Sequence, residues 1–189
     1  MLYIQLQNNI FTGTAYGHTI LGTLSGIEKI TIDDIKSFAL KHYSLKNLHL
    51  GFAGDFSKEI ITEINIQLNK LPLGKKIQQP KVTGRKIKGL EVQIIEKDTR
   101  ATSISIGHPI SVTRSHPDFF ALWLARAWLG EHRSSTGRLF QQIRELRGLN
   151  YGDYAYIEAF PHAMYQFFPN PNLGRRNQIF EIWIRPVLH

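Results

Sequence analysis

The clearest hydrophobic pattern in the chain lies in residues 138–151. Apolar residues recur there three or four positions apart, at Leu139, Phe140, Ile143 and Leu146. This spacing predicts a helix with one buried stripe, because about 3.6 residues make one helical turn. Gly148 is typical of a left-handed helix cap, with Leu149 folding back on the last turn, and Tyr151 then opens an aromatic strand.

Similar patterns predict the other elements. Helices are expected at 31–43, 57–69 and 118–130, each with apolar residues at helical spacing. The third helix is apolar on nearly all sides, which predicts deep burial. Strands are expected at 48–53, 91–98, 101–110, 152–160, 164–168 and 178–186, whereas residues 1–30 are rich in turn residues. This mixture of strands and helices predicts an α+β fold.

Composition narrows the class of protein without naming a compartment. The 189 residues are 42% hydrophobic, which is enough to bury a core, and they include no cysteine, so disulfides and thiol catalysis are excluded. No apolar run approaches the roughly 18 residues needed to span a bilayer. The first residues also lack the basic and apolar regions of a signal peptide.

The net charge of +8 is concentrated in residues 70–88, which contain seven Lys or Arg and no acid. Prolines and glycines interrupt the same stretch, which predicts an exposed basic linker at 71–89. A basic arm could also contact phosphates, so a nucleic-acid-binding module is one hypothesis. No aromatic side chains are interleaved with these charges, as binding to single strands requires, and a solvated linker is therefore favoured.

Arg144 and Tyr151 are the candidate site residues. Helical spacing places Arg144 on the flank of the apolar stripe, and Tyr151 follows seven residues later at a strand start. A guanidinium and a phenol both donate hydrogen bonds, so together they suit a peptide carbonyl or an oxyanion. The alternative is structural, because an Arg near a helix end commonly interacts with the helix dipole in solvent and a Tyr opening a strand commonly packs.

The sequence around this pair carries a family resemblance. Residues 134–151, SSTGRLFQQIRELRGLNY, resemble the second-domain segment of the pitrilysin/insulinase-like zinc peptidases, which include the mitochondrial processing peptidases. These proteins carry a serine-rich turn followed by R-L-F/Y-Q-x-x-R-E-x-x-G-L-x-Y. The matching residues are Ser134, Ser135, Arg138, Leu139, Phe140, Gln141, Arg144, Glu145, Gly148, Leu149 and Tyr151. The resemblance implies that Arg144 and Tyr151 are catalytic and substrate-binding residues, which hold and polarise the scissile peptide.

Two further runs share this resemblance, AYGHTILGTLSGIEKIT at 15–31 and YSLKNLHLGFAGDF at 43–56. In the family, each domain is a sheet with helices packed on one face. The resemblance therefore implies two partial metallopeptidase-like domains. Residues 1–70 would be the C-terminal half of the first, 71–89 the linker, and 90–189 the N-terminal half of the second. The chain would then be a fragment of a longer protein.

The zinc-binding motif of this family, H-x-x-E-H, is missing from the sequence. No two of the eight histidines stand four residues apart, so no pair matches the spacing of the two histidine ligands. We expect no metal site in this chain, and zinc belongs, by resemblance, to the complete enzyme.

Three functional hypotheses follow. The first is a fragment of a zinc-dependent endopeptidase that contributes substrate-binding and carbonyl-polarising residues and is inactive alone. The second is a non-catalytic partner subunit of a two-chain peptidase, or a structural subunit of the same family. The third is the basic nucleic-acid-binding module. The expected partners are a peptide substrate and either the remainder of the protein or a zinc-bearing partner subunit, with no nucleic acid and no membrane span.

Overall fold

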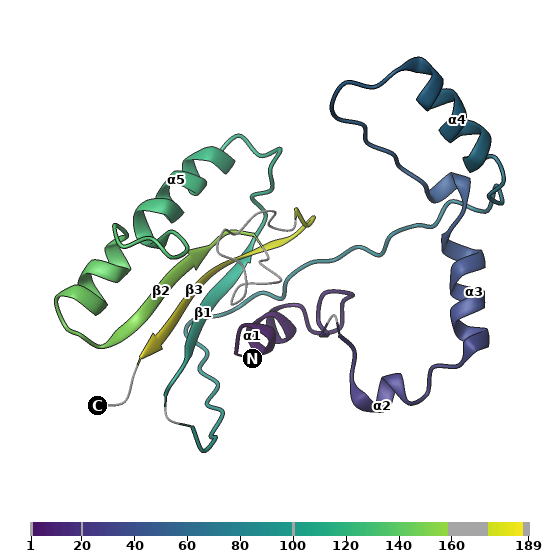
Figure 1. Ribbon diagram of the computed structural model, residues 1–189. Helices are drawn as coiled ribbons and strands as arrows, with labels where there is room; N and C mark the ends of the chain where they lie inside the picture. Colours follow the sequence, from purple (N-terminus) through teal and green to yellow (C-terminus); the bar gives the residue numbers. More distant parts are fainter. Residues whose placement is uncertain (1, 20, 100, 159–173, 187–189) are drawn as a thin grey trace. The chain divides into compact units, whose positions relative to one another are not determined.

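In the computed structural model of the chain, the described residues are 2–19, 21–99, 101–158 and 174–186. Their helices and strands, in chain order, are α1 (Leu2–Ile10), α2 (Leu24–Ile27), α3 (Ile32–His42), η1 (Leu45–Asn47), α4 (Lys58–Leu68), β1 (Ile104–Ile110), α5 (Phe119–Gly130), η2 (Phe140–Glu145), β2 (Asn150–Tyr156) and β3 (Gln178–Pro186) (Figure 1). The chain forms two compact units, one of residues 21–80 and one of residues 1–20 with 81–189. No helix in the described ranges has the length and apolar character needed to cross a membrane.

The unit of residues 21–80 is helical and largely exposed. Thr31 and Asp34 form a capping box at the start of α3, in which each side chain accepts a hydrogen bond from the backbone N–H of the other residue. The Ser57 side chain caps α4 in a similar way, by accepting from the backbone of its first turn. These two predicted helices are confirmed. Ser44 is the only buried residue in this unit, so the apolar faces of its helices stay open to solvent.

A three-stranded antiparallel sheet forms the centre of the other unit, with β3 between β1 and β2. Helix α1 contacts β1, while α5 and η2 contact β2. The buried core joins the end of α1 to the sheet through Ile10, Phe11, Val82 and Ile179. Because Ile10 and Phe11 are part of this core, residues 2–19 belong to the unit that contains the sheet. The mixed architecture confirms the predicted α+β class.

The predicted division at 1–70, 71–89 and 90–189 concerns domains of a longer protein and stays a prediction. Several local expectations are wrong. Residues 2–10 form α1 rather than turns, and neither 48–53 nor 91–98 forms a strand. Apolar alternation favours a strand only where a neighbouring strand completes the backbone hydrogen bonds, and the side chains of Leu90, Val92 and Ile94 instead lie exposed. The strand expected at 164–168 lies outside the described residues.

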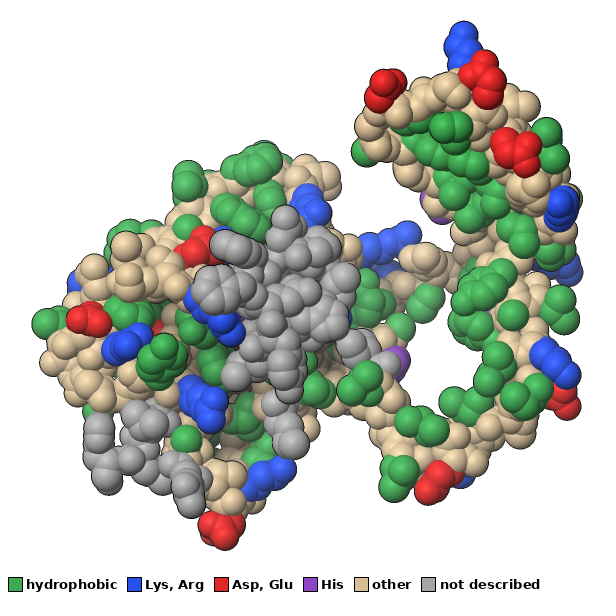
Figure 2. Space-filling model, in the orientation of Figure 1, with side chains coloured by type: hydrophobic (Ala, Val, Ile, Leu, Met, Phe, Trp, Pro, Cys, Tyr) green, Lys and Arg blue, Asp and Glu red, His purple; other side chains and the backbone are tan. Residues whose placement is uncertain are grey.

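Helix α5 forms where the sequence predicts it, but the expected deep burial is wrong. Phe120, Leu124 and Trp128 follow one another at intervals of four residues and are 73%, 70% and 67% exposed. Figure 2 shows hydrophobic side chains gathered over this helix. Part of the buried side is taken by Arg126, whose guanidinium lies 4.4 Å from the Trp123 ring centroid. A single packed layer covers only one side of a helix, so an all-apolar helix beside it keeps an exposed face.

Candidate functional site

Helix η2 has a wider turn than the sequence predicts. The Leu146 N–H donates to the Gln141 carbonyl at 3.1 Å, a bond that spans five residues and is characteristic of a π-helix. The extra residue in each turn carries Leu146 away from the buried stripe, so the prediction of its burial is wrong. Gly148 has φ +64° and donates to the Arg144 carbonyl at 2.8 Å. The predicted left-handed helix end at Gly148 is confirmed.

The structure brings Arg144 and Tyr151 into contact. The Arg144 guanidinium carbon lies 4.4 Å from the Tyr151 ring centroid and 4.7 Å from the Phe140 ring centroid. Arg144 Nη1 also donates to the Tyr151 backbone carbonyl, over 3.4 Å. Cation–π attraction of this kind is worth about 0.5–1 kcal/mol at an exposed site. The stacked arrangement therefore gives the long Arg144 side chain a preferred place above the phenol ring.

Tyr151 lies at an irregularity in β2. Asn150 pairs with Pro186 and Gly152 with Arg185, so Tyr151 is the extra residue of a β-bulge and has no paired residue on β3. Its side chain is 74% exposed. A bulge bends a strand and redirects the side chain of the extra residue, and bulges recur beside active sites. The bulge thus keeps the phenol of Tyr151 facing solvent.

Two polar residues that the sequence interpretation missed stand on either side of the bulge. Asn150 and Asp153 are 5% and 1% exposed, and Asn150 Nδ2 donates to Asp153 Oδ1. Burial raises the pKa of the Asp153 carboxyl to about 6, while the hydrogen bond from Asn150 and the positive charge of Arg144 act in the lowering direction. The spacing N-Y-G-D around the candidate tyrosine was the available signal, because it sets polar side chains in a strand that packs against a helix.

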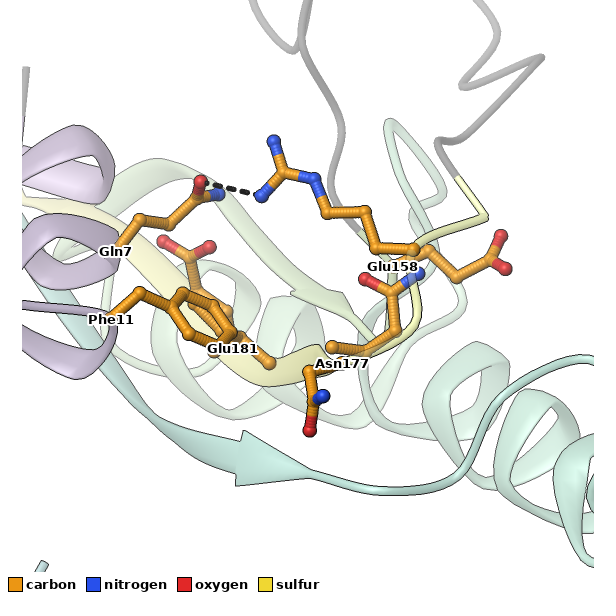
Figure 3. A pocket seen from close by; sticks show the side chains of 8 residues that line it. Gln7, Phe11, Glu158, Asn177 and Glu181 are labelled. Carbon is orange, nitrogen blue, oxygen red and sulfur yellow. Dashed lines mark hydrogen bonds between the residues drawn. The ribbon is translucent and has the colours of Figure 1, made fainter. Parts of the chain in front are cut away.

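A separate polar pocket lies between α1 and the sheet, lined on its charged side by Glu181 and Arg175. In Figure 3 the Gln7 and Glu181 side chains both point into it, and Arg175 Nη1 donates to Gln7 Oε1 at 3.1 Å. Glu181 is buried, and its Oε1 has no hydrogen-bond partner among the described residues. Burial raises the pKa of this carboxyl to about 8, although the nearby Ser105 hydroxyl acts in the lowering direction. The Ser105 Oγ, although close to Glu181, also makes no hydrogen bond of ordinary geometry with the described residues.

The described residues do not offer a zinc site. No three His, Cys, Asp or Glu side chains within the described ranges gather closely enough to hold a metal ion. The histidine beside the serine-rich turn, His132, is buried with its Nδ1 2.8 Å from Tyr156 Oη. A zinc ion needs three or four ligands of these types, so the donor set seen here does not fit it. What the Arg144–Tyr151 pair offers chemically is hydrogen-bond donation to an oxygen atom.

The comparisons with known proteins identify the family. Residues 29–169 match the profile of the Peptidase M16 inactive domain. This match covers most of the chain, so the chain belongs to the M16 peptidase family. The resemblance to the pitrilysin-like zinc peptidases is thereby confirmed.

Relatives with curated names differ in the activity that their names state. An uncharacterized zinc protease of Streptomyces coelicolor is 28% identical over 160 residues, which are 81% of this chain and 34% of the relative. The non-peptidase homologue YmxG of Helicobacter pylori is 29% identical over 152 residues, which are 80% of this chain and 34% of the relative. The chain thus spans 34% of the length of each of these two relatives.

Solved structures support the fold. The M16 inactive domain from Pseudomonas fluorescens superposes with a TM-score of 0.73 at 24% identity, over 98% of this chain and 41% of that one. A protease from Helicobacter pylori gives a TM-score of 0.78 at 20% identity, over 98% of this chain and 42% of that one. Identities this low show a shared fold and no more.

Proposed function

We propose that the chain is part of a zinc-dependent endopeptidase and contributes substrate-binding and carbonyl-polarising residues, while the zinc site lies outside it. Arg144 and Tyr151 are the residues we assign to this role. The observation that carries the proposal is the guanidinium of Arg144 stacked 4.4 Å from the ring centroid of an exposed tyrosine. The name of the Streptomyces relative, a zinc protease, supports the reaction class.

The surroundings of Tyr151 suit an extended peptide. Within the described part of the chain, β2 pairs with β3 on one side only. An extended peptide can lie along a strand with an unpaired side, with its carbonyl groups held by hydrogen-bond donors at the end of that strand. The phenol of Tyr151 and the guanidinium of Arg144 are two such donors at the beginning of β2. Donors of this kind stabilise the negative charge that develops on a carbonyl oxygen during peptide hydrolysis.

Replacing Tyr151 tests the proposal. In the complete enzyme, Tyr151→Phe keeps the ring that stacks against Arg144 and removes only the hydroxyl. We expect peptide turnover to fall roughly ten- to a thousandfold, the scale for losing one donor to an oxyanion. The measurement is hydrolysis of oxidised insulin B chain, followed by mass spectrometry. The matched control is Tyr43→Phe, another exposed tyrosine, which lies in the unit of residues 21–80. Unchanged turnover in Tyr151→Phe would rule out the assigned role.

A second candidate function is a non-catalytic subunit that acts beside a zinc-bearing partner. The name of the Helicobacter relative, a non-peptidase homologue, favours it. The two candidates differ in what the complete purified protein, of which this chain is a part, does with added zinc. An endopeptidase hydrolyses the insulin B chain by itself, whereas a partner subunit does so only when a zinc-bearing chain is supplied.

A further inference from the structure

The polar pair Asn150 and Asp153 has unsatisfied hydrogen-bonding atoms although it is buried. Asn150 Oδ1 and Asp153 Oδ2 both lack a hydrogen-bond partner in the part of the chain that the structure describes. Leaving a buried polar atom unpaired costs roughly 1–3 kcal/mol, so apolar residues at these two positions would give a more stable strand. The two residues flank the bulge at Tyr151, which points to a role in fixing the bulge rather than in stabilising the strand.

The side chains of Asn150 and Asp153 are joined by a hydrogen bond across the bulge. The bond from Asn150 to Asp153 spans the three-residue step that contains Tyr151 and Gly152. An added Cβ at Gly152 would lie 2.8 Å from Tyr154 Oη, so a side chain there would require the Tyr154 ring to move. The Asp153 backbone packs closely against the end of α5, since a Cβ on Gly130 would lie 3.2 Å from the Asp153 carbonyl oxygen. The backbone around Tyr151 is therefore held by close packing and by the side-chain bond beneath it.

The same pair is electrostatically linked to Arg144. The positive charge of Arg144 lowers the pKa of Asp153, against the larger effect of burial. The hydrogen bond from the Asn150 amide lowers the same pKa. Burial raises the pKa of the Tyr154 phenol, and the charge of the adjacent Asp153 adds to that rise. Arg144 Nη1 donates to the carbonyl of Tyr151, two residues from Asp153, so an ionised Asp153 attracts a guanidinium that already lies beside the bulge. This attraction reduces the freedom of the guanidinium to move away from the Tyr151 ring.

We propose that Asn150 and Asp153 are positioning residues of the Arg144–Tyr151 site. Together they fix the bulge that turns the phenol outward, and the Asp153 carboxylate holds the guanidinium over the phenol ring. Neither residue touches the peptide. The purpose of this arrangement rests on the proposed function, whereas the coupling between the four residues can be measured without it.

Nuclear magnetic resonance on this chain measures the coupling. In the wild type, the Arg144 Nε–Hε signal and the Tyr151 ring signals should shift together as pH rises, with a midpoint of about 6 set by Asp153. Asp153→Asn should abolish this shared titration. Asp55→Asn, an exposed aspartate in the other unit, should preserve it. Signals that do not titrate in the wild type, or that titrate unchanged in Asp153→Asn, would overturn the proposal.

A second pair of variants covers the case in which Asp153→Asn does not fold. Arg144→Gln and Asn150→Ser each remove a group that lowers the pKa of Asp153, so each should raise the midpoint of the Asp153 carboxyl carbon signal. A midpoint that stays the same in both variants would also overturn the proposal.

Activity in the complete enzyme separates this inference from the proposed function. If the signals are coupled but Tyr151→Phe leaves turnover unchanged, the positioning pair stands and the peptidase role fails. If Tyr151→Phe slows turnover but the signals are not coupled, the peptidase role stands and the positioning pair fails. If both hold, Asp153→Asn should lower kcat more than it raises KM, because a loosened donor weakens the transition state more than the bound peptide.

Discussion

At the scale of single residues, the backbone is most unusual just before the serine-rich turn. Arg133 has φ +55° and is the only non-glycine residue with positive φ in the described ranges. It follows His132, which is buried against the Tyr154 and Tyr156 rings and within hydrogen-bond distance of Tyr156 Oη. Residues 132 and 133 form a turn, and the left-handed conformation of Arg133 is part of that turn.

Replacing Arg133 by glycine should therefore stabilise the protein. A left-handed conformation costs a residue with a side chain roughly 1–2 kcal/mol, and glycine avoids this cost. Part of the gain is lost because glycine makes the unfolded chain more flexible. We expect the free energy of unfolding of Arg133→Gly to rise by roughly 0.5–1 kcal/mol in urea titrations. Arg147→Gly is the control, because Arg147 does not have positive φ and should lose stability from the added flexibility. A loss of stability in Arg133→Gly would mean that contacts of the arginine outweigh the strain.

At the scale of elements, the sequence predicts the proximity of Arg144 and Tyr151 but not the geometry around them. The helix end at Gly148 and the proximity of Arg144 to Tyr151 follow from local spacing, and a glycine is what a left-handed cap favours. The π-turn of η2 and the bulge at Tyr151 could not be predicted in this way. The bulge depends on how β2 aligns with β3, and Tyr151 is separated in sequence from its neighbours Arg185 and Pro186 by more than thirty residues. The docking of α1 was missed for a similar reason, since Phe11 meets Ile179 only in the folded chain.

The free energy of unfolding should depend on pH through Glu181, which lies in the pocket between α1 and the sheet. The pKa of this carboxyl is raised from 4.5 to about 8, so the folded state holds a proton that the unfolded state has lost. Its contribution to stability is full below about pH 4.5 and is lost as pH rises through about 8. Glu181→Gln should remove this loss, making the variant more stable than the wild type at pH 9 by at least about 1 kcal/mol.

Urea titrations between pH 6.5 and 9 measure this effect. Most of that window lies above the pKa of Asp153, which is raised only to about 6. Glu96→Gln, an exposed glutamate, is the matched control and should follow the wild-type curve. Parallel curves for wild type and Glu181→Gln would show that Glu181 is hydrated in the folded state.

At the scale of the whole molecule, exposed apolar surface distinguishes this chain from an ordinary globular domain. The stripe of Phe120, Leu124 and Trp128 on α5 lies in the unit that contains the sheet. Each unit also keeps further apolar side chains exposed. Contiguous apolar surface of this kind drives association in water, because it is removed from solvent when two surfaces meet.

Self-association of the isolated chain should therefore depend on the α5 stripe. Leu124→Lys places a charge at the centre of the stripe, and burying a leucine is worth about 1.5–3 kcal/mol. We expect the dissociation constant from sedimentation equilibrium to rise at least roughly tenfold. Gln141→Lys adds the same charge at an exposed position of η2 and should leave association unchanged. Equal association of the two variants would assign the contact to a different surface.

At the scale of the whole molecule, zinc binding by this chain tests whether the zinc site of the proposed endopeptidase lies outside it. A tight zinc site needs three or four converging nitrogen, oxygen or sulfur ligands, and the described residues bring no three candidates together. The proposed function places the zinc site outside this chain, so we expect calorimetric titration of the chain with zinc to give no saturable one-to-one heat. The assignment of Arg144 and Tyr151 as donors to a peptide carbonyl requires that the metal approach from outside the chain. A tight stoichiometric site within these 189 residues would give the chain its own metal chemistry, and the two donors would then no longer need a zinc-bearing remainder or partner.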